Sequence, residues 1–376
     1  MAYTRRFPAR KACFSQTHTN VSAQSMDQLS DYDYKLPREL IASKPARHRA
    51  DARLLVIDRE IGSWEHKKVS DLPSYVRPND VMVLNNTRVV PARLLGKRSS
   101  TGGQWEGLFL KVNEDGTWAM LGKTKGKIQV GEIVEVYPAH EPESADRLRL
   151  TMTARGSEGE WSAQPENQES HLELLQKFGT MPLPPYMRKK IATDRDFRRY
   201  QTTFAGQPGS VAAPTAGLHF TQELLTQIQS EGVSVSQVTL HIGIGTFRPI
   251  TTESLADHTM HSEWCELSDE TAQMLVDQKA SGGRVMAVGT TSVRTLESAA
   301  RQTPLKSFTG ETDLFIRPPY EFQAVDMLMT NFHLPKSSLL VLVSAFAGRE
   351  LIMEAYQAAI QEKYRFYSYG DAMLIL

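Results

Sequence analysis

Two histidines of the sequence stand in segments whose neighbours could admit a ligand. His219 closes a run of small residues, Ala212-Ala213-Pro214-Thr215-Ala216-Gly217, just before Thr221, a residue type that often begins a helix. His333 lies in the polar segment Thr330–Pro335. Imidazole titrates near neutral pH, so both are candidates for proton transfer. A hydrogen-bonded structural histidine is the alternative at each position.

A third histidine, His241, is followed by two glycines. If the segment is a strand, alternation places His241, Gly243 and Gly245 on one face, where a flat ligand could lie beside the titratable ring. We count Gly243, Gly245 and Thr246 as candidate cofactor-binding residues and His241 as a catalytic one. The alternative is a close contact between a helix and the sheet at the glycines. A lone Gly-x-Gly is not a dinucleotide-binding fingerprint.

A candidate anion site begins where a predicted strand turns into a predicted helix. Gly289, Thr290, Thr291 and Arg294 would direct N–H groups, hydroxyls and a guanidinium at a phosphate or an amino-acid carboxylate. In the structural alternative, Ser292 caps the helix and Arg294 pairs with a neighbouring acid.

Two further polar clusters could face a site. Asn85 and Arg88 follow an apolar run, and we expect them to contact a cofactor or a base. Asp371 lies in the aromatic C-terminal segment, where it is a candidate catalytic carboxylate. Core packing around a hydrogen-bonded aspartate is the alternative.

Basic and aromatic residues concentrate between Tyr186 and Phe204. Six basic residues stand there against Asp194 and Asp196, so the stretch could grip a phosphate backbone while its rings stack on an unpaired base. A solvated helix face is the alternative. The candidate RNA-contacting residues are Arg188, Lys189, Lys190, Arg198, Arg199 and Tyr200.

Composition limits the class of protein. The 376 residues carry 43 Lys plus Arg against 43 Asp plus Glu, so any polyanionic partner must be held by a local patch. The two cysteines lack the spacing of a zinc site or a disulfide framework, which favours a reducing, cytoplasmic setting. The longest apolar run is much shorter than the ~20 residues that span a membrane.

The elements that must position these residues are of two kinds. Between residues 91 and 166, short β-like runs alternate with glycine turns, which predicts a small antiparallel β-barrel. In 26–90 and 167–376, apolar runs alternate with amphipathic segments, which predicts an α/β fold: a three-layer body with a mixed sheet, interrupted by the barrel. We expect helices at 221–230, 269–279, 292–301 and 349–363, and strands at 233–244, 284–288 and 338–346.

The first 25 residues are basic and free of acids. We expect a disordered N-terminal extension ahead of an initiator at Met26; a transit peptide has the same composition.

Ten ordered segments together resemble the S-adenosylmethionine:tRNA ribosyltransferase-isomerases of queuosine biosynthesis. The match runs from about Asp27 to the C-terminus. Its segments are 36–42, 85–94, 182–186, 199–202, 212–221, 241–247, 260–264, 289–297, 330–335 and 369–373.

The resemblance implies that S-adenosylmethionine is a ribosyl-donating co-substrate and that no metal is needed. The ribosyl unit would pass to an aminomethyl deazaguanine at the tRNA wobble position and isomerise, giving epoxyqueuosine-tRNA, adenine and methionine. The sulfonium acidifies the adjacent 5′ methylene, so a positioned base can begin the rearrangement by removing a proton. We expect His241 or His219 to be this base, and Arg294 with Thr290 and Thr291 to hold the methionine carboxylate or, in a different arrangement of the site, a tRNA phosphate.

Two other functions are the alternatives: an S-adenosylmethionine-dependent RNA methyltransferase and a non-catalytic RNA-binding protein. The sequence disfavours the methyltransferase, because the α/β part begins without a glycine-rich strand-to-helix fingerprint. We expect a cytoplasmic monomer that binds the precursor tRNA and no membrane.

Overall fold

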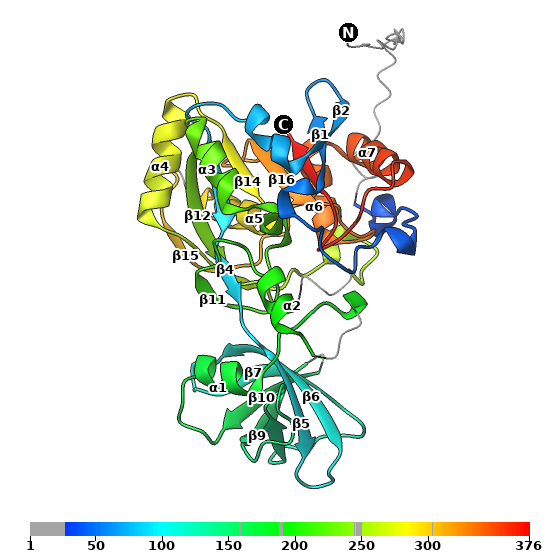
Figure 1. Ribbon diagram of the computed structural model, residues 1–376, viewed down its shortest axis with the longest axis vertical. Coiled ribbons are helices and arrows are strands. Elements are labelled where there is room, and N and C mark those ends of the chain that lie inside the picture. The colour runs from blue at the N-terminus through cyan, green and yellow to red at the C-terminus, as the bar shows by residue number, and fades with distance from the viewer. Residues whose placement is uncertain (1–26, 158, 188–190, 244, 246–249, 303) are drawn as a thin grey trace.

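The computed structural model describes residues 27–157, 159–187, 191–243, 245, 250–302 and 304–376. Figure 1 shows a larger body built around a mixed sheet and, at one end of the long axis, a smaller barrel. The predicted fold class, an α/β body interrupted by an antiparallel barrel, is confirmed.

Nine strands form the central sheet in the order β15-β13-β12-β3-β14-β16-β17-β1-β2. β3 pairs in parallel with β12 and β14, and β14 pairs in parallel with β16, so the carboxyl ends of these four strands meet at one edge. The strands are β1 (Arg53–Asp58), β2 (Ser63–Lys68), β3 (Val81–Asn85), β12 (Ser234–Leu240), β13 (Glu263–Leu267), β14 (Val285–Val288), β15 (Phe308–Thr312), β16 (Met327–Asn331) and β17 (Ala372–Ile375); β4 (Thr87–Val89) pairs separately with β11 (Gln207–Ser210).

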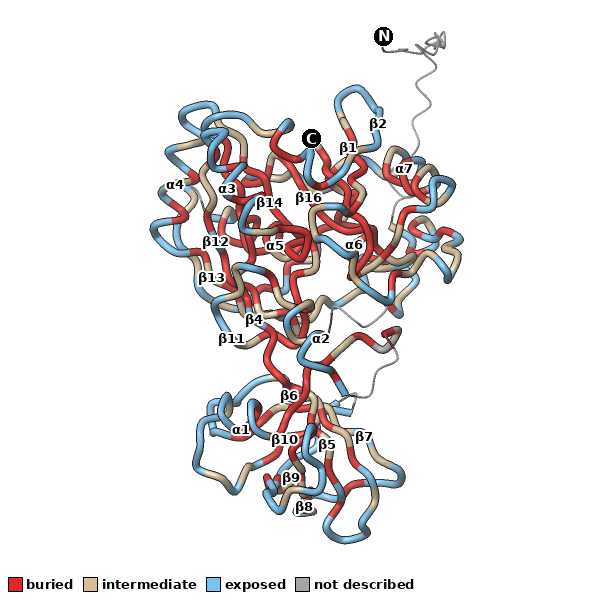
Figure 2. Tube along the Cα trace, viewed as in Figure 1, coloured by how far each residue is buried: buried red, intermediate tan, exposed pale blue. Residues whose placement is uncertain are grey.

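Side chains of successive strand residues point to opposite faces of the sheet. Both faces are covered, so neighbouring residues of one strand belong to different apolar clusters. Val81 and Val83 of β3 join one buried cluster, while Met82 and Leu84 join the other. Figure 2 shows this burial along the central strands. Four helices contribute to the first cluster, namely α4 (Asp269–Ala280), α5 (Thr290–Ala299), α6 (Ser338–Ala347) and α7 (Arg349–Gln361), and α3 (Gln222–Ser230) contributes to the second.

Short 3-10 helices connect these elements. They are η2 (Leu29–Tyr32), η3 (Arg38–Leu40), η4 (Arg49–Asp51), η5 (Val69–Tyr75), η6 (Pro185–Met187), η7 (Thr215–His219) and η9 (Leu255–Asp257).

One predicted strand is wrong. Residues 338–346 form the helix α6, which begins where the Ser337 side chain accepts a hydrogen bond from the N–H of Leu340. A helix buried on most sides carries the same continuous apolar run as a buried strand, so periodicity could not separate them. The expected helices at 221–230, 269–279, 292–301 and 349–363 and the strand at 284–288 are confirmed with shifted ends. The strand expected at 233–244 ends at Leu240, so His241 lies just beyond it.

The barrel is a closed antiparallel sheet with its own apolar core. Leu174, Leu175 and Phe178 of α1 (His171–Phe178) pack into the same cluster as Trp118 and Leu150 of the barrel strands. The barrel strands are β5 (Arg93–Arg98), β6 (Gln104–Val112), β7 (Trp118–Thr124), β8 (Ile133–Tyr137), β9 (Leu148–Arg155) and β10 (Glu160–Pro165).

Gly179 lies where the chain leaves α1, against the strand that enters the barrel. A Cβ atom at Gly179 would lie 1.8 Å from the carbonyl oxygen of Pro91. We expect Gly179→Ala to lower the free energy of unfolding by at least about 2 kcal/mol in denaturant titrations, because main-chain atoms must move apart. Gly310→Ala is the matched control, since its Cβ would meet no atom closer than 3.6 Å. Equal stability of the two variants would contradict this reading of the junction.

Candidate active site

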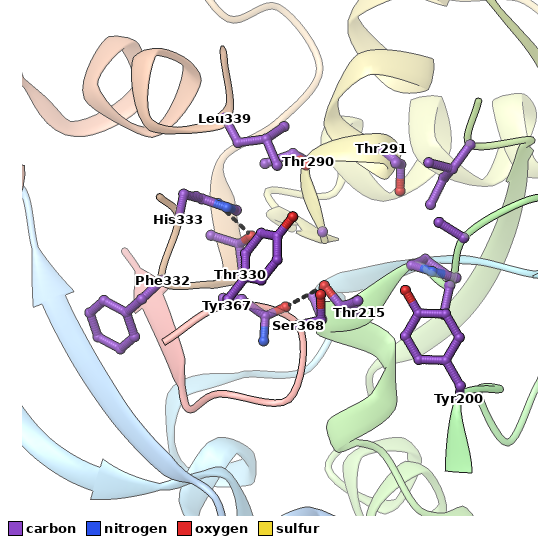
Figure 3. Close-up of a pocket in the computed structure, with 17 residues that line it drawn as sticks. Tyr200, Thr215, Thr290, Thr291, Thr330, Phe332, His333, Leu339, Tyr367 and Ser368 are labelled. Atoms are coloured by element: carbon purple, nitrogen blue, oxygen red, sulfur yellow. Dashed lines mark hydrogen bonds between the residues drawn. The ribbon is translucent and has the colours of Figure 1, made fainter. Parts of the chain in front are cut away.

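A cavity opens at the carboxyl edge of the parallel strands. About 600 Å³ of empty space lies within it when the open mouth is counted. Figure 3 shows side chains from several distant segments converging on it. Most lining residues come from 212–216, the turn into α5, the end of β16 with the loop after it, and the C-terminal segment. The full lining is Tyr200, Ala212, Ala213, Pro214, Thr215, Ala216, Ile242, Gly289, Thr290, Thr291, Thr330, Asn331, Phe332, His333, Leu339, Tyr367 and Ser368.

The N-terminus of α5 forms one wall of this cavity. Gly289 occupies the left-handed region, with φ 88°, and turns the chain from β14 into the helix without a side-chain cap. The first N–H groups of a helix have no partner within it and favour an anion. Gly289, Thr290 and Thr291, which the sequence placed at an anion site, all line the cavity; the N–H of Gly289 donates to the carbonyl of Met329, so the donors of the helix start are those of Thr290 and Thr291.

Asn85 is buried behind this wall. Its Nδ2 donates to the carbonyl of Leu240 and to Oγ1 of Thr291, both at 3.0 Å. Its Oδ1 accepts from the N–H groups of Thr87 and Leu240, at 3.0 and 3.1 Å. Since the amide is fully bonded within the protein, Asn85 positions the ends of β3 and β12 and the start of α5.

Arg294 also lies inside the protein and does not line the cavity. It forms a buried ion pair with Glu263 and donates to the carbonyls of Thr312 and Leu314, at 3.0 and 3.1 Å. Oε1 of Glu263 in turn accepts from the N–H of Gly243, at 2.8 Å. Arg294 thus holds, through Glu263, the glycine segment that follows His241.

Two of the three histidines are enclosed. Burial lowers the pKa of His333 to about 3, and its Nε2 lies 3.2 Å from Oγ1 of Thr330, beside the cavity. Burial also lowers the pKa of His219 to about 4, and its Nε2 lies 3.2 Å from Nδ2 of Asn331. His219 is therefore one layer behind the wall, and both rings are neutral at pH 7.

His241 faces a different space, a cleft between barrel and body. Nδ1 of His241 lies 2.8 Å from Oγ1 of Thr87, and the ring stacks on Trp264 with centroids 5.0 Å apart. Burial lowers the pKa of His241. Gly243 and Gly245 line this cleft, and Ile242 lines both the cleft and the cavity, so the two spaces are neighbours.

The remaining predicted residues fall outside these walls. Asp371 accepts from the N–H groups of Arg53 and Arg365 and from Nη2 of Arg365, at 3.1, 2.8 and 3.0 Å, and so ties down the turn before β17. Arg88 is exposed and donates to the carbonyl of Ala205 at 2.9 Å. Thr246, Arg188, Lys189 and Lys190 lie outside the described residues.

The predicted RNA-contacting residues separate in the structure. Arg198, in α2 (Asp194–Arg199), is exposed, whereas Tyr200 is fully buried and has no face free for stacking. Arg199 donates to the carbonyls of Ala46 and Arg47. The segment 44–49, which the sequence analysis did not connect with this patch, is thereby held against it.

The sequence analysis also missed Tyr367 and Ser368 as lining residues of the cavity. In the sequence, their segment stood out for its aromatic residues and for Asp371. The one structural sign is a left-handed φ of 75° at Tyr367, which is unusual for a residue with a side chain.

In the described part of the chain, no cluster of three or more His, Cys, Asp or Glu side chains could hold a metal ion. No helix among those residues is long and apolar enough to cross a membrane.

The fold and the cavity define a class: an α/β protein with an inserted barrel and a small-molecule cavity at the carboxyl ends of parallel strands. The chain belongs to the family of queuosine biosynthesis proteins, whose model matches residues 29–375. It is 45% identical to an S-adenosylmethionine:tRNA ribosyltransferase-isomerase of Desulforamulus reducens over 93% of this chain and 100% of that protein. A crystal structure of an S-adenosylmethionine tRNA ribosyltransferase from Thermotoga maritima matches with a TM-score of 0.52 and 34% identity, over 92% of this chain and 100% of that one.

The buried histidines predict how stability depends on pH. Below pH 6.5 the unfolded chain binds protons at His219 and His333 that the folded protein excludes, since their folded pKa values are about 4 and 3. We therefore expect the free energy of unfolding to fall by about 2 kcal/mol for each ring between pH 7 and pH 5. His333→Gln should weaken this dependence, whereas His66→Gln, at an exposed position, should not. Denaturant titrations across this pH range would contradict the prediction if His333→Gln left the slope unchanged.

Proposed function

We propose that this protein is an S-adenosylmethionine:tRNA ribosyltransferase-isomerase. It transfers the ribosyl unit of S-adenosylmethionine to the aminomethyl deazaguanine of a precursor tRNA and isomerises it, releasing adenine and methionine. The observation that carries the proposal is the cavity at the carboxyl edge of the sheet, in a chain that matches this family over residues 29–375. We further propose that the protein acts in the cytoplasm as a monomer.

The lining of the cavity suits S-adenosylmethionine. None of the described residues that line it carries a formal charge at neutral pH, and Tyr367, which is only partly buried, supplies an aromatic ring. Aromatic faces attract a cation such as a sulfonium. The N-terminus of α5 offers N–H groups to the methionine carboxylate. Arg294 does not bind this carboxylate, because the donors of Arg294 are used within the protein.

The cleft beside the cavity suits the base of the tRNA. It lies between barrel and body, where Lys111 of β6 pairs with Glu311 of β15 at 3.8 Å. A co-substrate in the cavity and a base in the cleft would approach each other beside Ile242, which lines both. Bringing the two reactants together in this way removes much of the entropic cost of their reaction.

We assign the removal of the 5′ proton to His241. Its ring is half-buried at the cleft, whereas the pKa of about 3 makes His333 a poor base and His219 lies behind Asn331. When Nδ1 donates to Oγ1 of Thr87, Nε2 keeps its lone pair and can accept the proton. The lowered pKa keeps the ring neutral, and so competent as a base, at pH 7.

The proposal predicts the products and the effect of one substitution. Mixed with S-adenosylmethionine and precursor tRNA, the protein should release adenine and methionine, and His241→Gln should lower the turnover number at least about 100-fold because a general base is lost. In the wild type, turnover should rise with pH as His241 loses its proton, with the midpoint of the rise below pH 6.5. Chromatography of the released products, repeated across pH, measures both.

His66→Gln is the control for this experiment, since His66 is exposed and bonds to Tyr364 away from both cavities. Release of S-adenosylhomocysteine would instead identify a methyltransferase, and release of neither product would leave an RNA-binding protein. Near-wild-type turnover of His241→Gln would overturn the assignment of the base alone.

We assign the binding of the tRNA backbone to the surface formed by residues 44–49 and α2. Lys44, Arg47, Arg195 and Arg198 are exposed on these segments. Arg49 donates to the carbonyls of Arg198 and Gln201, which joins the segments without using a carboxylate. Exposed guanidinium and ammonium groups that lie together suit the phosphate backbone of RNA.

The double variant Arg47→Ala/Arg198→Ala tests this surface. We expect weaker tRNA binding and a less steep dependence of log affinity on log salt, by about 1 to 2 in slope, because up to two phosphate contacts are lost. Affinity for S-adenosylmethionine should not change. The matched control is Arg301→Ala/Lys306→Ala, exposed positions beyond the far end of α5. Equal slopes for wild type and Arg47→Ala/Arg198→Ala, measured by filter binding, would rule out the surface.

A further inference from the structure

The side chain of Tyr200 is buried yet lies at the wall of the cavity. Its relative exposure is 0%, and Figure 3 shows its hydroxyl directed from the end of α2 toward the other lining residues. The sequence placed Tyr200 among residues that stack on RNA. A ring without an exposed face cannot do so, and another reason for a tyrosine at this position is needed.

The hydroxyl of Tyr200 has no hydrogen-bond partner among the described residues. The main-chain group that affects its pKa is the N–H of Ala213, which is a donor and cannot accept the hydroxyl proton. Burial raises the pKa of Tyr200 well above its ordinary value, so the proton stays on the oxygen at neutral pH. A buried donor without an acceptor is costly, and most such groups in proteins are paired.

Packing explains the ring of Tyr200 but not its oxygen. The ring meets Tyr369 edge to face, with centroids 5.8 Å apart, in a cluster with Met181, Met187 and Leu218. A phenylalanine would fill the same space. Two other buried tyrosines near the cavity show the ordinary arrangement: the hydroxyls of Tyr34 and Tyr356 bond to the main chain of His333.

A ligand in the cavity could provide the hydrogen-bond acceptor that the Tyr200 hydroxyl lacks among the described residues. The other buried side-chain atoms without partners among the described residues belong to residues that do not line it, so Tyr200 is the unpaired donor at this wall. We infer that the hydroxyl of Tyr200 donates a hydrogen bond to an acceptor atom of the S-adenosylmethionine bound there, and that it is a cofactor-binding residue. This inference rests on the proposed function. The co-substrate offers carboxylate, ribose and adenine acceptors.

Tyr200→Phe removes only the oxygen. Since no described residue accepts a hydrogen bond from the hydroxyl, the midpoint of thermal unfolding without ligand should stay the same or rise. Affinity for S-adenosylmethionine, measured by calorimetry, should fall about tenfold, which corresponds to one hydrogen bond. Affinity for the precursor tRNA should not change. A structural role for the hydroxyl would move stability, not affinity.

Tyr364→Phe is the matched control with the opposite pattern. Tyr364 is equally buried, but its hydroxyl bonds to Nδ1 of His66 at 2.8 Å, so its loss should lower the midpoint and leave affinity unchanged. Unchanged affinity of Tyr200→Phe for S-adenosylmethionine overturns the inference, and so does a loss confined to tRNA binding. Wild-type protein that binds no S-adenosylmethionine at all would instead count against the proposed function.

Discussion

One buried amide, that of Asn85, holds together the edge on which the site is built. Its four hydrogen-bonding positions are all used, by Thr87, Leu240 and Thr291. These residues belong to segments far apart in the chain, and a buried polar group left unpaired would cost free energy comparable to a lost hydrogen bond. The ends of β3 and β12 and the start of α5 are therefore fixed relative to one another, and with them the walls of the cavity.

A second buried interaction extends this frame toward the barrel. The ion pair of Arg294 and Glu263 links α5 to the N–H of Gly243, next to Ile242, which lines both the cavity and the cleft. A buried ion pair adds little net stability, because the free-energy cost of removing two charges from water offsets most of their attraction. Its main effect here is to fix the positions of the segments that it joins. The segment that follows His241 and Ile242 is therefore held in place by the bond between Glu263 and Gly243.

The contrast between the two spaces suits a reaction of two very different substrates. The described lining of the cavity has the ring of Tyr367, hydroxyls and a helix N-terminus but no formal charge, which fits a compact ligand with a cationic sulfur and a carboxylate. The cleft lies between two separately packed parts and can receive a base presented by a large RNA. Exposed cations also lie on 44–49 and α2, so the charge of a neutral chain is unevenly distributed, and this is the surface proposed for the tRNA backbone.

The sequence by itself determined the fold class, the barrel, most helices, the family and the segments that meet at the site, because periodicity, glycine turns and ordered motifs are local properties. It could not separate the buried helix α6 from a strand, since both carry one continuous apolar run. It also could not tell a residue that faces a ligand from one that holds the wall: Asn85, Arg294 and Asp371 have ligand-binding chemistry, and only tertiary contacts reveal that their groups bond within the protein. Tyr200 shows the converse: its burial, and a hydroxyl without a partner among the described residues, arise only once distant segments have packed around it.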